Sequence, residues 1–322
     1  MRRLIVFSDP GGAKPCLALA NKWLQNHDIL VCSDREFSFF ECFRIKVRKC
    51  LTDQADTVIE EFAPDSIYTG TSYSSDLELA FLAKGRERGI PTSAFVDHYT
   101  QFRSRFVLGD DLILPDEIHV LDERAYKMAL GAGLPQDRIH ITGNPYHDYL
   151  RRWTTSTSRS DLWIKLGFVD SPGPVLLFAP DPLSNVGGID KFGSDERLIF
   201  RYLIDALEEI GGPIQLVIKA HPNQNIEYLK SELDNRNNKV GIRCFIVGPE
   251  IDSALNDLIV RSDLVIGMFS SLIVEAEILG IPTLRLLCGL SIEDPLNGIA
   301  IGESVQNRSA ITWHLKRFLG RS

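Results

Sequence analysis

The chain has 322 residues, of which 44% are hydrophobic and 24% charged, with a formal net charge of −8 and a pI near 5.4. This length is too great for one ordinary domain and fits two, and the acidic balance argues against a nucleic-acid-binding protein, which needs a concentrated basic face. No apolar run approaches the roughly 20 residues that span a bilayer, and the N-terminal MRRLIVFSD predicts a first strand and not a signal peptide.

Short apolar runs alternate with longer amphipathic stretches along the whole chain, which is typical of βα units in parallel sheets. In the first half, the predicted strands are 4–8, 28–33, 66–70, 91–96, 117–121 and 138–143. In the second half, they are 175–181, 215–222, 241–248, 264–268 and 282–287. We expect a helix after each strand, for example over 75–88 and 122–132.

The strand series is interrupted once, between a GNP at 143–145 and a Gly/Pro cluster near 172. This pattern predicts an α/β fold of two Rossmann-like, doubly wound domains facing a central cleft, with sites at the carboxyl ends of the strands. The predicted parts are an N-terminal domain over 1–145, a linker over 146–172 and a C-terminal domain over 173–322. The last helix, 311–322, either crosses back to the N-terminal domain, which we favour, or makes a weak membrane-surface contact.

Six scattered cysteines show neither a CxxC motif nor a metal-like Cys/His spacing. They predict free, buried thiols in a reducing cytoplasm. From the cysteines we expect a cytoplasmic protein, and from the acidic net charge we expect one that binds no nucleic acid.

The stretch DLVIGMFSSLIVEAEILGIPTLRL, 263–286, passes from a buried strand directly into a helix. Ser270 is in the N-cap position, where free N–H groups and the helix dipole favour an anion, so Ser270 and Ser271 suit a phosphate. Glu275 follows Ser271 by four residues on the same helix face and could accept both hydroxyls of a ribose. The alternative is a simple helix cap with a favourable charge nearby.

A second motif, VIKAHPNQ, places His221 and Pro222 at the end of another buried strand. The imidazole is expected at the same carboxyl edge as the serine pair. A lone histidine is usually structural, but this combination is more specific.

The KAHP motif followed by SDLVIGMFSSLIVEAEILGIPTLRL resembles the C-terminal domain of GT-B fold glycosyltransferases. The nearest group is that of bacterial capsule and cell-wall polymer enzymes: CDP-glycerol glycerophosphotransferases, sialyl- and polysialyltransferases, and Kdo transferases. Nucleotide-sugar 2-epimerases share the architecture. The resemblance covers 215–287 and implies that His221, Ser270 and Ser271 contact donor phosphates and that Glu275 holds the ribose. It also implies a metal-independent enzyme without a cofactor, whose substrate is a CMP-, CDP- or UDP-activated sugar.

Two loops of the second half are candidates to complete the donor site. The loop 178–196 contains Gly187 and Gly188, whose backbone N–H groups could approach a diphosphate; the alternative is a mobile surface loop. By analogy with the fold, the segment 246–252 is expected to contact the nucleotide base.

In the first half, VFSDPGGAKP places Asp9, Gly11 and Gly12 in the turn after the first strand. The pattern is not GxGxxG, so it does not predict a dinucleotide site. The glycines either make a tight turn or form a backbone platform for an acceptor or donor phosphate.

The segment AFVDHYTQFRSRF, 94–106, places Asp97 and His98 directly after an apolar strand. Either residue could be the base that deprotonates an acceptor hydroxyl, with the Asp–His couple tuning the imidazole; the alternative is a polar strand cap. Arg103 and Arg105 suit an anionic acceptor or a carboxylate, or else form a solvated face. The acidic residues of the nearby GDD are interpreted as surface charge and not as a metal site.

The sequence differs from the families that it resembles at this strand end. VDHY stands where sialyltransferases have two acidic residues and a glycine, and the HG of glycerophosphotransferases is missing. The leading hypothesis is a glycosyltransferase that uses a glycan or lipid-linked acceptor in bacterial surface polysaccharide synthesis, with peripheral membrane contact left open. The alternatives are a hydrolysing nucleotide-sugar 2-epimerase and a non-catalytic nucleotide-sugar-binding protein. The epimerase needs further acidic residues, and Glu36 and Glu41 lack the expected spacing.

Overall fold

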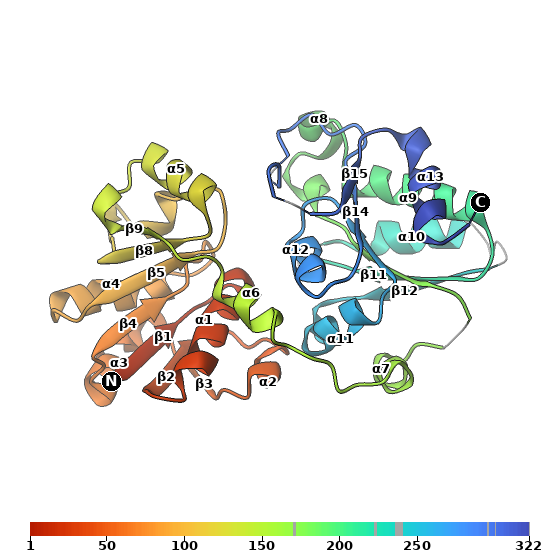
Figure 1. Ribbon diagram of the computed structural model, residues 1–322. Coiled ribbons are helices and arrows are strands. Elements are labelled where there is room, and N and C mark those ends of the chain that lie inside the picture. The colour runs from red at the N-terminus through yellow and green to blue at the C-terminus, as the bar shows by residue number, and fades with distance from the viewer. Residues whose placement is uncertain (170–171, 222–223, 236–240, 295, 300, 322) are drawn as a thin grey trace. The chain divides into compact units, whose positions relative to one another are not determined.

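The computed structural model describes residues 1–169, 172–221, 224–235, 241–294, 296–299 and 301–321. The chain divides into two compact units, Met1–Arg152 and Trp153–Ser322, which we call the N-terminal and C-terminal units. Each unit contains its own parallel sheet with helices around it (Figure 1). The predicted α/β class with two Rossmann-like domains is confirmed.

The N-terminal unit is built on a seven-stranded parallel sheet in the order β3-β2-β1-β4-β5-β8-β9. Its strands are β1 (Arg2–Val6), β2 (Asp28–Ser33), β3 (Val47–Lys49), β4 (Ser66–Thr69), β5 (Thr92–Val96), β8 (Glu117–Val120) and β9 (Ile139–Ile141). Its helices are α1 (Pro10–Trp23), α2 (Phe40–Phe43), α3 (Ala55–Phe62), α4 (Leu77–Glu87), α5 (Glu123–Gly131) and α6 (Pro145–Leu150). A short hairpin of β6 (Val107–Leu108) and β7 (Asp111–Leu112) follows β5.

The C-terminal unit repeats the plan with a six-stranded parallel sheet in the order β12-β11-β10-β13-β14-β15. Its strands are β10 (Val175–Ala179), β11 (Ile214–Lys219), β12 (Ile242–Val247), β13 (Leu264–Gly267), β14 (Thr283–Leu286) and β15 (Glu303–Val305). Its α-helices are α7 (Arg159–Leu166), α8 (Gly188–Phe192), α9 (Glu196–Ile210), α10 (Glu227–Asn235), α11 (Leu255–Val260), α12 (Ser271–Ile278) and α13 (Ile311–Phe318). The 3₁₀ turns η4 (Leu183–Val186) and η5 (Pro249–Ala254) follow β10 and β12.

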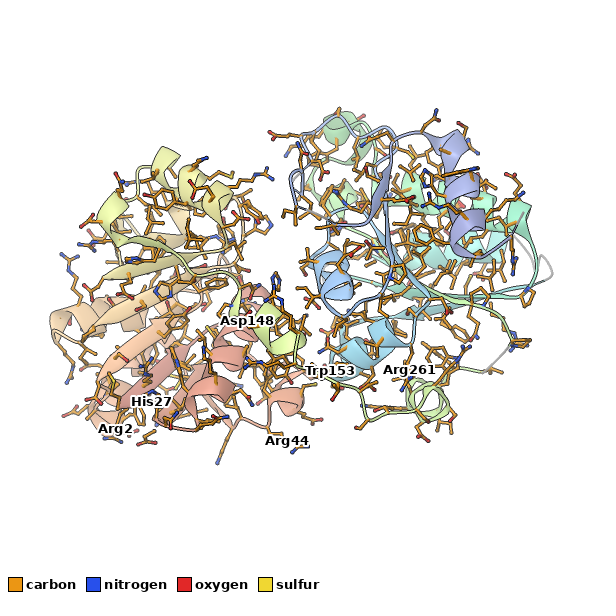
Figure 2. All side chains as sticks on the ribbon, viewed as in Figure 1. Arg2, His27, Arg44, Asp148, Trp153 and Arg261 are labelled. Atoms are coloured by element: carbon orange, nitrogen blue, oxygen red, sulfur yellow. The ribbon has the colours of Figure 1, made fainter. Side chains whose placement is uncertain are left out.

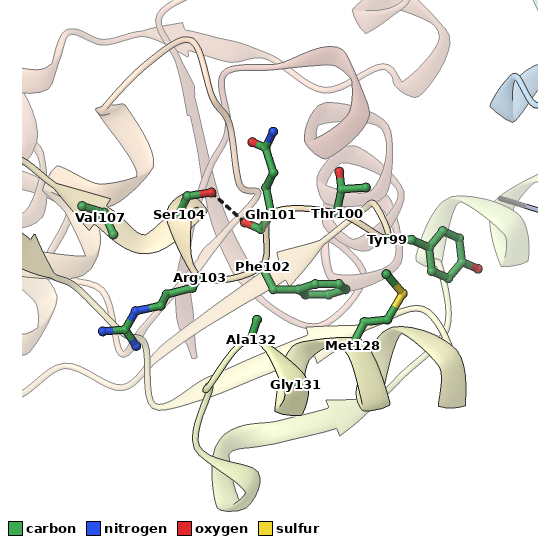
Figure 3. Close-up of a pocket in the computed structure, with 10 residues that line it drawn as sticks. All are labelled: Tyr99, Thr100, Gln101, Phe102, Arg103, Ser104, Val107, Met128, Gly131 and Ala132. Carbon is green, nitrogen blue, oxygen red and sulfur yellow. Dashed lines mark hydrogen bonds between the residues drawn. The ribbon is translucent and has the colours of Figure 1, made fainter. Parts of the chain in front are cut away.

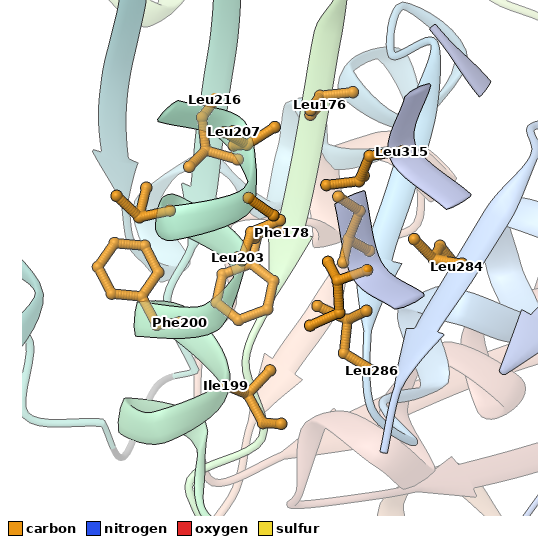
Figure 4. Close-up of a cluster of buried hydrophobic side chains, with 14 of the residues drawn as sticks. Leu176, Phe178, Ile199, Phe200, Leu203, Leu207, Leu216, Leu284, Leu286 and Leu315 are labelled. Carbon is orange, nitrogen blue, oxygen red and sulfur yellow. The ribbon is translucent and has the colours of Figure 1, made fainter. Parts of the chain in front are cut away.

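The central strand β10 shows why the apolar runs are continuous. Leu176 and Phe178 lie in one buried cluster with side chains of α9 and α13, as seen in Figure 4, whereas Leu177 lies in a second cluster with α7, α11 and α12. Alternate side chains of one strand therefore enter cores on opposite faces, so both positions must be apolar.

The segment that joins the two units is held to each of them by specific contacts. Leu150 of α6 is buried in the N-terminal unit, whereas Trp153, labelled in Figure 2, begins the C-terminal unit. Farther on, the Arg261 guanidinium donates a hydrogen bond of 2.6 Å to the Thr157 carbonyl. The helix α7 falls within the predicted linker, and α6 begins at Pro145, one residue before it.

Several sequence predictions need correction. The strands β3 and β15 were not predicted, because each has three residues and too little apolar periodicity to detect. No α-helix follows β5 or β14 before the next strand in the parts of these loops that the structure describes.

The last helix, α13, packs on α9 within the C-terminal unit, and its crossing back to the N-terminal unit stays a prediction. Ile311 and Leu315 are fully buried in the C-terminal core, and the Thr312 hydroxyl donates a hydrogen bond of 2.9 Å to Glu209.

All six cysteines are free, and four of them are buried. Among the described residues, no helix combines the length and apolar character that crossing a membrane requires.

Candidate functional site

In the C-terminal unit, the strand order reverses between β10 and β13, which is where open α/β sheets bind ligands. Ala179 of β10 is paired with Gly267 of β13 at this point. A Cβ atom on Gly267 would lie 3.0 Å from the Ala179 carbonyl oxygen, so glycine permits the two strands to approach closely here. The residues that follow β13, Met268 to Ser271, form what we call the serine loop.

The serine loop leads into α12 as the sequence predicts. Ser270 is the N-cap, and its hydroxyl oxygen accepts a hydrogen bond of 3.4 Å from the Leu272 N–H. This bond is long, so the cap is weak. Ser271 is the first helical residue and is exposed. The phosphate role of the two serines stays a prediction.

Glu275 lies on the same helix but is only 3% exposed. It shares a buried helix face with Leu272, Ile273 and Ala276. Its contact with a ribose also stays a prediction, and that contact would require the carboxylate to be uncovered.

His221 lies two residues beyond β11 at the carboxyl edge of the sheet, and it is exposed. Its backbone N–H donates a hydrogen bond of 3.1 Å to the Gln224 side chain. Partial burial of the ring and the nearby Lys219 lower the pKa of His221, whereas Asp252 opposes them. A neutral imidazole can both donate and accept a hydrogen bond. Pro222 lies outside the described residues.

A buried ion pair beside His221 was missed by sequence reasoning. The Lys219 ammonium, with 8% of its side chain exposed, lies 3.0 Å from a carboxylate oxygen of Asp252. Asp252 belongs to η5 and to the segment 246–252 that was predicted to contact a base. This pair therefore fixes that segment against the end of β11.

Two further charged residues that were not predicted contact the serine loop. One carboxylate oxygen of Asp181, just after β10, accepts a hydrogen bond of 3.1 Å from the Phe269 N–H. Burial raises the pKa of Asp181 to about 7, although the N–H groups of Met268, Phe269 and Ser270 stabilise its charged form. Arg285 of β14 is 4% exposed and donates a hydrogen bond of 2.9 Å to the Met268 carbonyl.

The glycine-bearing loop after β10 folds into η4 and α8. Gly187 has φ 126° and Gly188 has φ 51°, values that favour glycine, and a Cβ on Gly187 would lie 2.8 Å from a side-chain carbon of Lys191. Local folding therefore accounts for both glycines, and their diphosphate role stays a prediction.

In the N-terminal unit, the strand order reverses between β1 and β4, and Asp9 lies three residues beyond the end of β1. One Asp9 oxygen accepts a hydrogen bond of 2.9 Å from Arg35, and the other accepts one of 3.0 Å from the Tyr73 N–H. Asp9 thus connects the loops that follow β2 and β4. It is at the N-cap position of α1 but makes no side-chain cap bond.

The two glycines after Asp9 are required by close contacts, not by a tight turn. A Cβ on Gly12 would lie 3.2 Å from the Gly70 Cα, and one on Gly11 would lie 1.9 Å from an Asp97 carboxylate oxygen. The side chain of Asp97 is therefore packed against the first turn of α1.

Asp97 is paired with Arg105 and not with its neighbour His98. The guanidinium lies 3.1 Å from an Asp97 oxygen and also donates hydrogen bonds of 3.0 and 3.1 Å to the Thr71 carbonyl and hydroxyl. The His98 ring instead makes a hydrogen bond of 3.0 Å with the Thr100 hydroxyl. Asp97 and His98 therefore share no hydrogen bond, but each acts electrostatically on the pKa of the other, and the Asp–His couple stays a prediction.

Burial raises the pKa of Asp97, and Arg105 and then His98 oppose this effect. Burial lowers the pKa of His98, so its imidazole is neutral near pH 7. A carboxyl group with a raised pKa and a neutral imidazole are both groups that can accept a proton.

Arg105 and Arg103 have different environments. Only 5% of the Arg105 side chain is exposed, so the alternative of a solvated face is wrong for this residue. Arg103 is exposed and lines a cavity of about 690 Å³, where Phe102 and Met128 face each other (Figure 3).

A buried carboxyl group that contacts the loop after β4 was also missed by sequence reasoning. Glu78 of α4 is 2% exposed and accepts hydrogen bonds of 3.0 Å from the Ser8 N–H and 2.8 Å from the Ser72 hydroxyl. Burial raises its pKa to about 7. The only sequence signal was the hydroxyl-rich TSYSSDLE after the strand.

Among the described residues, no three histidine, cysteine or acidic side chains are grouped so that they could hold a metal ion. Asp110 and Asp111 are exposed near the tip of the β6–β7 hairpin.

The sequence matches no family model and no curated protein. Solved structures do match. A UDP-GlcNAc 2-epimerase from Neisseria meningitidis, bound to UDP-GlcNAc, has a TM-score of 0.70 at 15% identity, over 99% of this chain and 92% of that one. A UDP-GlcNAc 2-epimerase from Methanocaldococcus jannaschii, in complex with UDP-GlcNAc and UDP, has a TM-score of 0.62 at 15% identity, over 100% and 94%.

The HepE protein of Anabaena, in complex with UDP, has a TM-score of 0.58 at 18% identity, over 98% of this chain and 90% of that one. At these identities the likeness shows the fold alone. The chain therefore has the two-unit, Rossmann-like fold of these proteins over nearly its whole length.

Proposed function

We propose that this protein is an enzyme that binds a UDP-activated sugar and inverts its configuration at C2, as a nucleotide-sugar 2-epimerase. The observation that carries the proposal is the serine loop at the strand-order reversal of the C-terminal unit, in a chain that matches UDP-GlcNAc 2-epimerase structures over almost its full length. This observation favours the 2-epimerase, which the sequence analysis gave as an alternative, over the glycosyltransferase.

We assign nucleotide binding to the C-terminal unit. The exposed Ser271 and the N-cap Ser270 offer hydroxyls at the N-terminus of α12, where a phosphate is stabilised by N–H groups and the helix dipole. His221, at the neighbouring strand end, offers a neutral imidazole as a further hydrogen-bond donor to the phosphate.

We assign proton transfer to the N-terminal unit. Inversion at a carbon that bears a hydrogen requires that a proton leave from one face and that a proton return on the other, so the site needs a base and an acid. Asp97 is suited to such exchange, because burial raises its pKa while Arg105 keeps the charged form accessible. His98 is the second candidate, since its neutral ring is exposed.

A glycosyltransferase remains the second candidate, and a specific observation favours it. Transfer needs one base, whereas inversion at C2 needs two proton-transferring groups. Of the other acids considered, Glu78 is buried, Asp9 is paired with Arg35, and both Glu36 and Glu41 are exposed. Under this alternative, the acceptor is a glycan or a lipid-linked sugar.

Incubation of the purified protein with UDP-GlcNAc in D₂O separates these functions. An epimerase yields the C2-inverted sugar, free or still linked to UDP, with deuterium at C2, and it needs no acceptor. A transferase releases UDP only when an acceptor is added and leaves C2 protonated. Absence of both UDP binding and turnover contradicts the proposal, and binding without turnover leaves a non-catalytic nucleotide-sugar-binding protein.

A further inference from the structure

Two charged side chains hold the serine loop from opposite sides. Asp181 follows β10 and Arg285 lies in β14, and these are the strands that flank β13 in the sheet. Each side chain contacts the backbone that follows β13. Asp181 lies 88 residues from Phe269 in the sequence, and Arg285 lies on the neighbouring strand β14.

Asp181 occupies the N–H side of the loop. Its carboxylate accepts a hydrogen bond of 3.1 Å from the Phe269 N–H, and the neighbouring N–H groups of Met268 and Ser270 also favour its charged form. The Phe269 N–H lies just before the N-cap Ser270, and it therefore precedes the first-turn N–H groups that a helix N-terminus offers to a bound anion. The described part of the chain pairs no lysine, arginine or histidine with Asp181, so backbone N–H groups stabilise its charge.

Arg285 occupies the carbonyl side. Its Nε donates 2.9 Å to the Met268 carbonyl, and another nitrogen of the guanidinium contacts Asp294. Asp294 in turn accepts a hydrogen bond of 2.9 Å from the Leu296 N–H. The peptide group between Met268 and Phe269 is therefore fixed through both of its polar groups, its carbonyl by Arg285 and its N–H by Asp181.

We propose that Asp181 and Arg285 are positioning residues for phosphate binding: they preset the serine loop, so that the hydroxyls of Ser270 and Ser271 and the later N–H groups of α12 receive one phosphate of the nucleotide. This inference rests on the proposed function. A loop that is fixed before binding avoids the entropy cost of being ordered by the ligand. Because the Phe269 N–H already binds Asp181, the phosphate is directed to the serine hydroxyls and to the first turn of α12.

The test compares UDP with uridine, which lacks the phosphates, in calorimetric and NMR titrations of the full chain. Asp181→Ala removes the acceptor and should weaken UDP binding about tenfold or more while leaving uridine binding unchanged. Asp181→Asn keeps one acceptor oxygen and should bind UDP more tightly than Asp181→Ala. Arg285→Lys tests the carbonyl side, and should also weaken UDP binding without affecting uridine, even if Asp181→Ala does not fold.

Asp263 provides a matched control. It lies just before β13, at the amino ends of the strands, and its carboxylate accepts a hydrogen bond of 2.7 Å from the Val175 N–H. Asp263→Ala should leave the ratio of UDP to uridine affinity unchanged. The inference is overturned if Asp181→Ala and Arg285→Lys bind UDP like the wild type, or if they lose UDP and uridine affinity equally. A wild-type protein that binds no UDP would instead refute the proposed function, and the inference with it.

Discussion

Replacing Glu78 by glutamine should change how the stability of the N-terminal unit depends on pH. The carboxyl group is 2% exposed, and it accepts hydrogen bonds from the Ser8 N–H and the Ser72 hydroxyl. A glutamine of the same shape can accept from the Ser8 N–H and donate to the Ser72 oxygen, and the Ser72 hydroxyl can then donate to the Ser75 carbonyl 3.0 Å away. The network can therefore survive without a charge.

The size of the effect follows from the pKa of Glu78. Burial raises this pKa from its ordinary value of 4.5 to about 7, so the folded state binds the proton more tightly than the unfolded state. Glu78 is mainly protonated below about pH 7 in the folded state but only below pH 4.5 in the unfolded state, so the free energy of unfolding falls as the pH rises from 4.5 through 7. The interval between the two pKa values corresponds to about 3 kcal/mol. Glu78→Gln should lack this fall.

Peptide-resolved hydrogen exchange in β1 and β4 measures the effect within this unit. Wild type and variant are compared at the same pH, so the intrinsic exchange rates cancel. Protection in Glu78→Gln should exceed that of the wild type by an amount that grows between pH 4.5 and pH 8. The exposed Glu60 of α3 is the control, and Glu60→Gln should follow the wild type. An equal difference between Glu78→Gln and wild type at all pH values would refute the reasoning.

Three further predictions concern the candidate site. Asp97→Asn should lower turnover by about 10²–10⁴ with UDP affinity unchanged, as expected for loss of a proton-transferring group; normal turnover in steady-state assays would assign that role elsewhere, first to His98. Gly11→Ala should lower turnover without unfolding the protein, because its Cβ would displace the Asp97 carboxylate; unchanged kinetics with an unchanged melting temperature would show that this contact does not matter. Ser271→Ala should weaken UDP binding by about 1.5–3 kcal/mol in calorimetry, and an unchanged Kd would make Ser271 a helix residue only.

Sequence patterns correctly predicted those helices and strands whose structure depends on residues within or next to the element itself. The apolar run of β10 is buried on both faces of the sheet, so its side chains alone identify it. Ser270 is an N-cap because of its immediate neighbours in the chain. The positions of β3 and β15 were missed, because three residues carry no readable period.

The charged contacts of the site could not be predicted in this way, because each depends on partners far along the chain. Arg105 is buried because Thr71, 34 residues earlier, accepts its hydrogen bonds. Asp181 meets the backbone of Phe269, 88 residues later. In the sequence alone, each of these residues is a polar side chain in a loop, and burial cannot be inferred without its partner.

The two units hold comparable carboxylates by different physical means. Asp97 follows a strand, packs against the first turn of α1, and has a guanidinium at 3.1 Å. Asp181 follows a strand, contacts the loop before α12, and is stabilised by backbone N–H groups. An ion pair leaves Asp97 free to exchange a proton without moving the backbone, whereas protonation of Asp181 would weaken the hydrogen bonds that fix the serine loop. The same residue type therefore suits acid–base chemistry in one unit and loop positioning in the other.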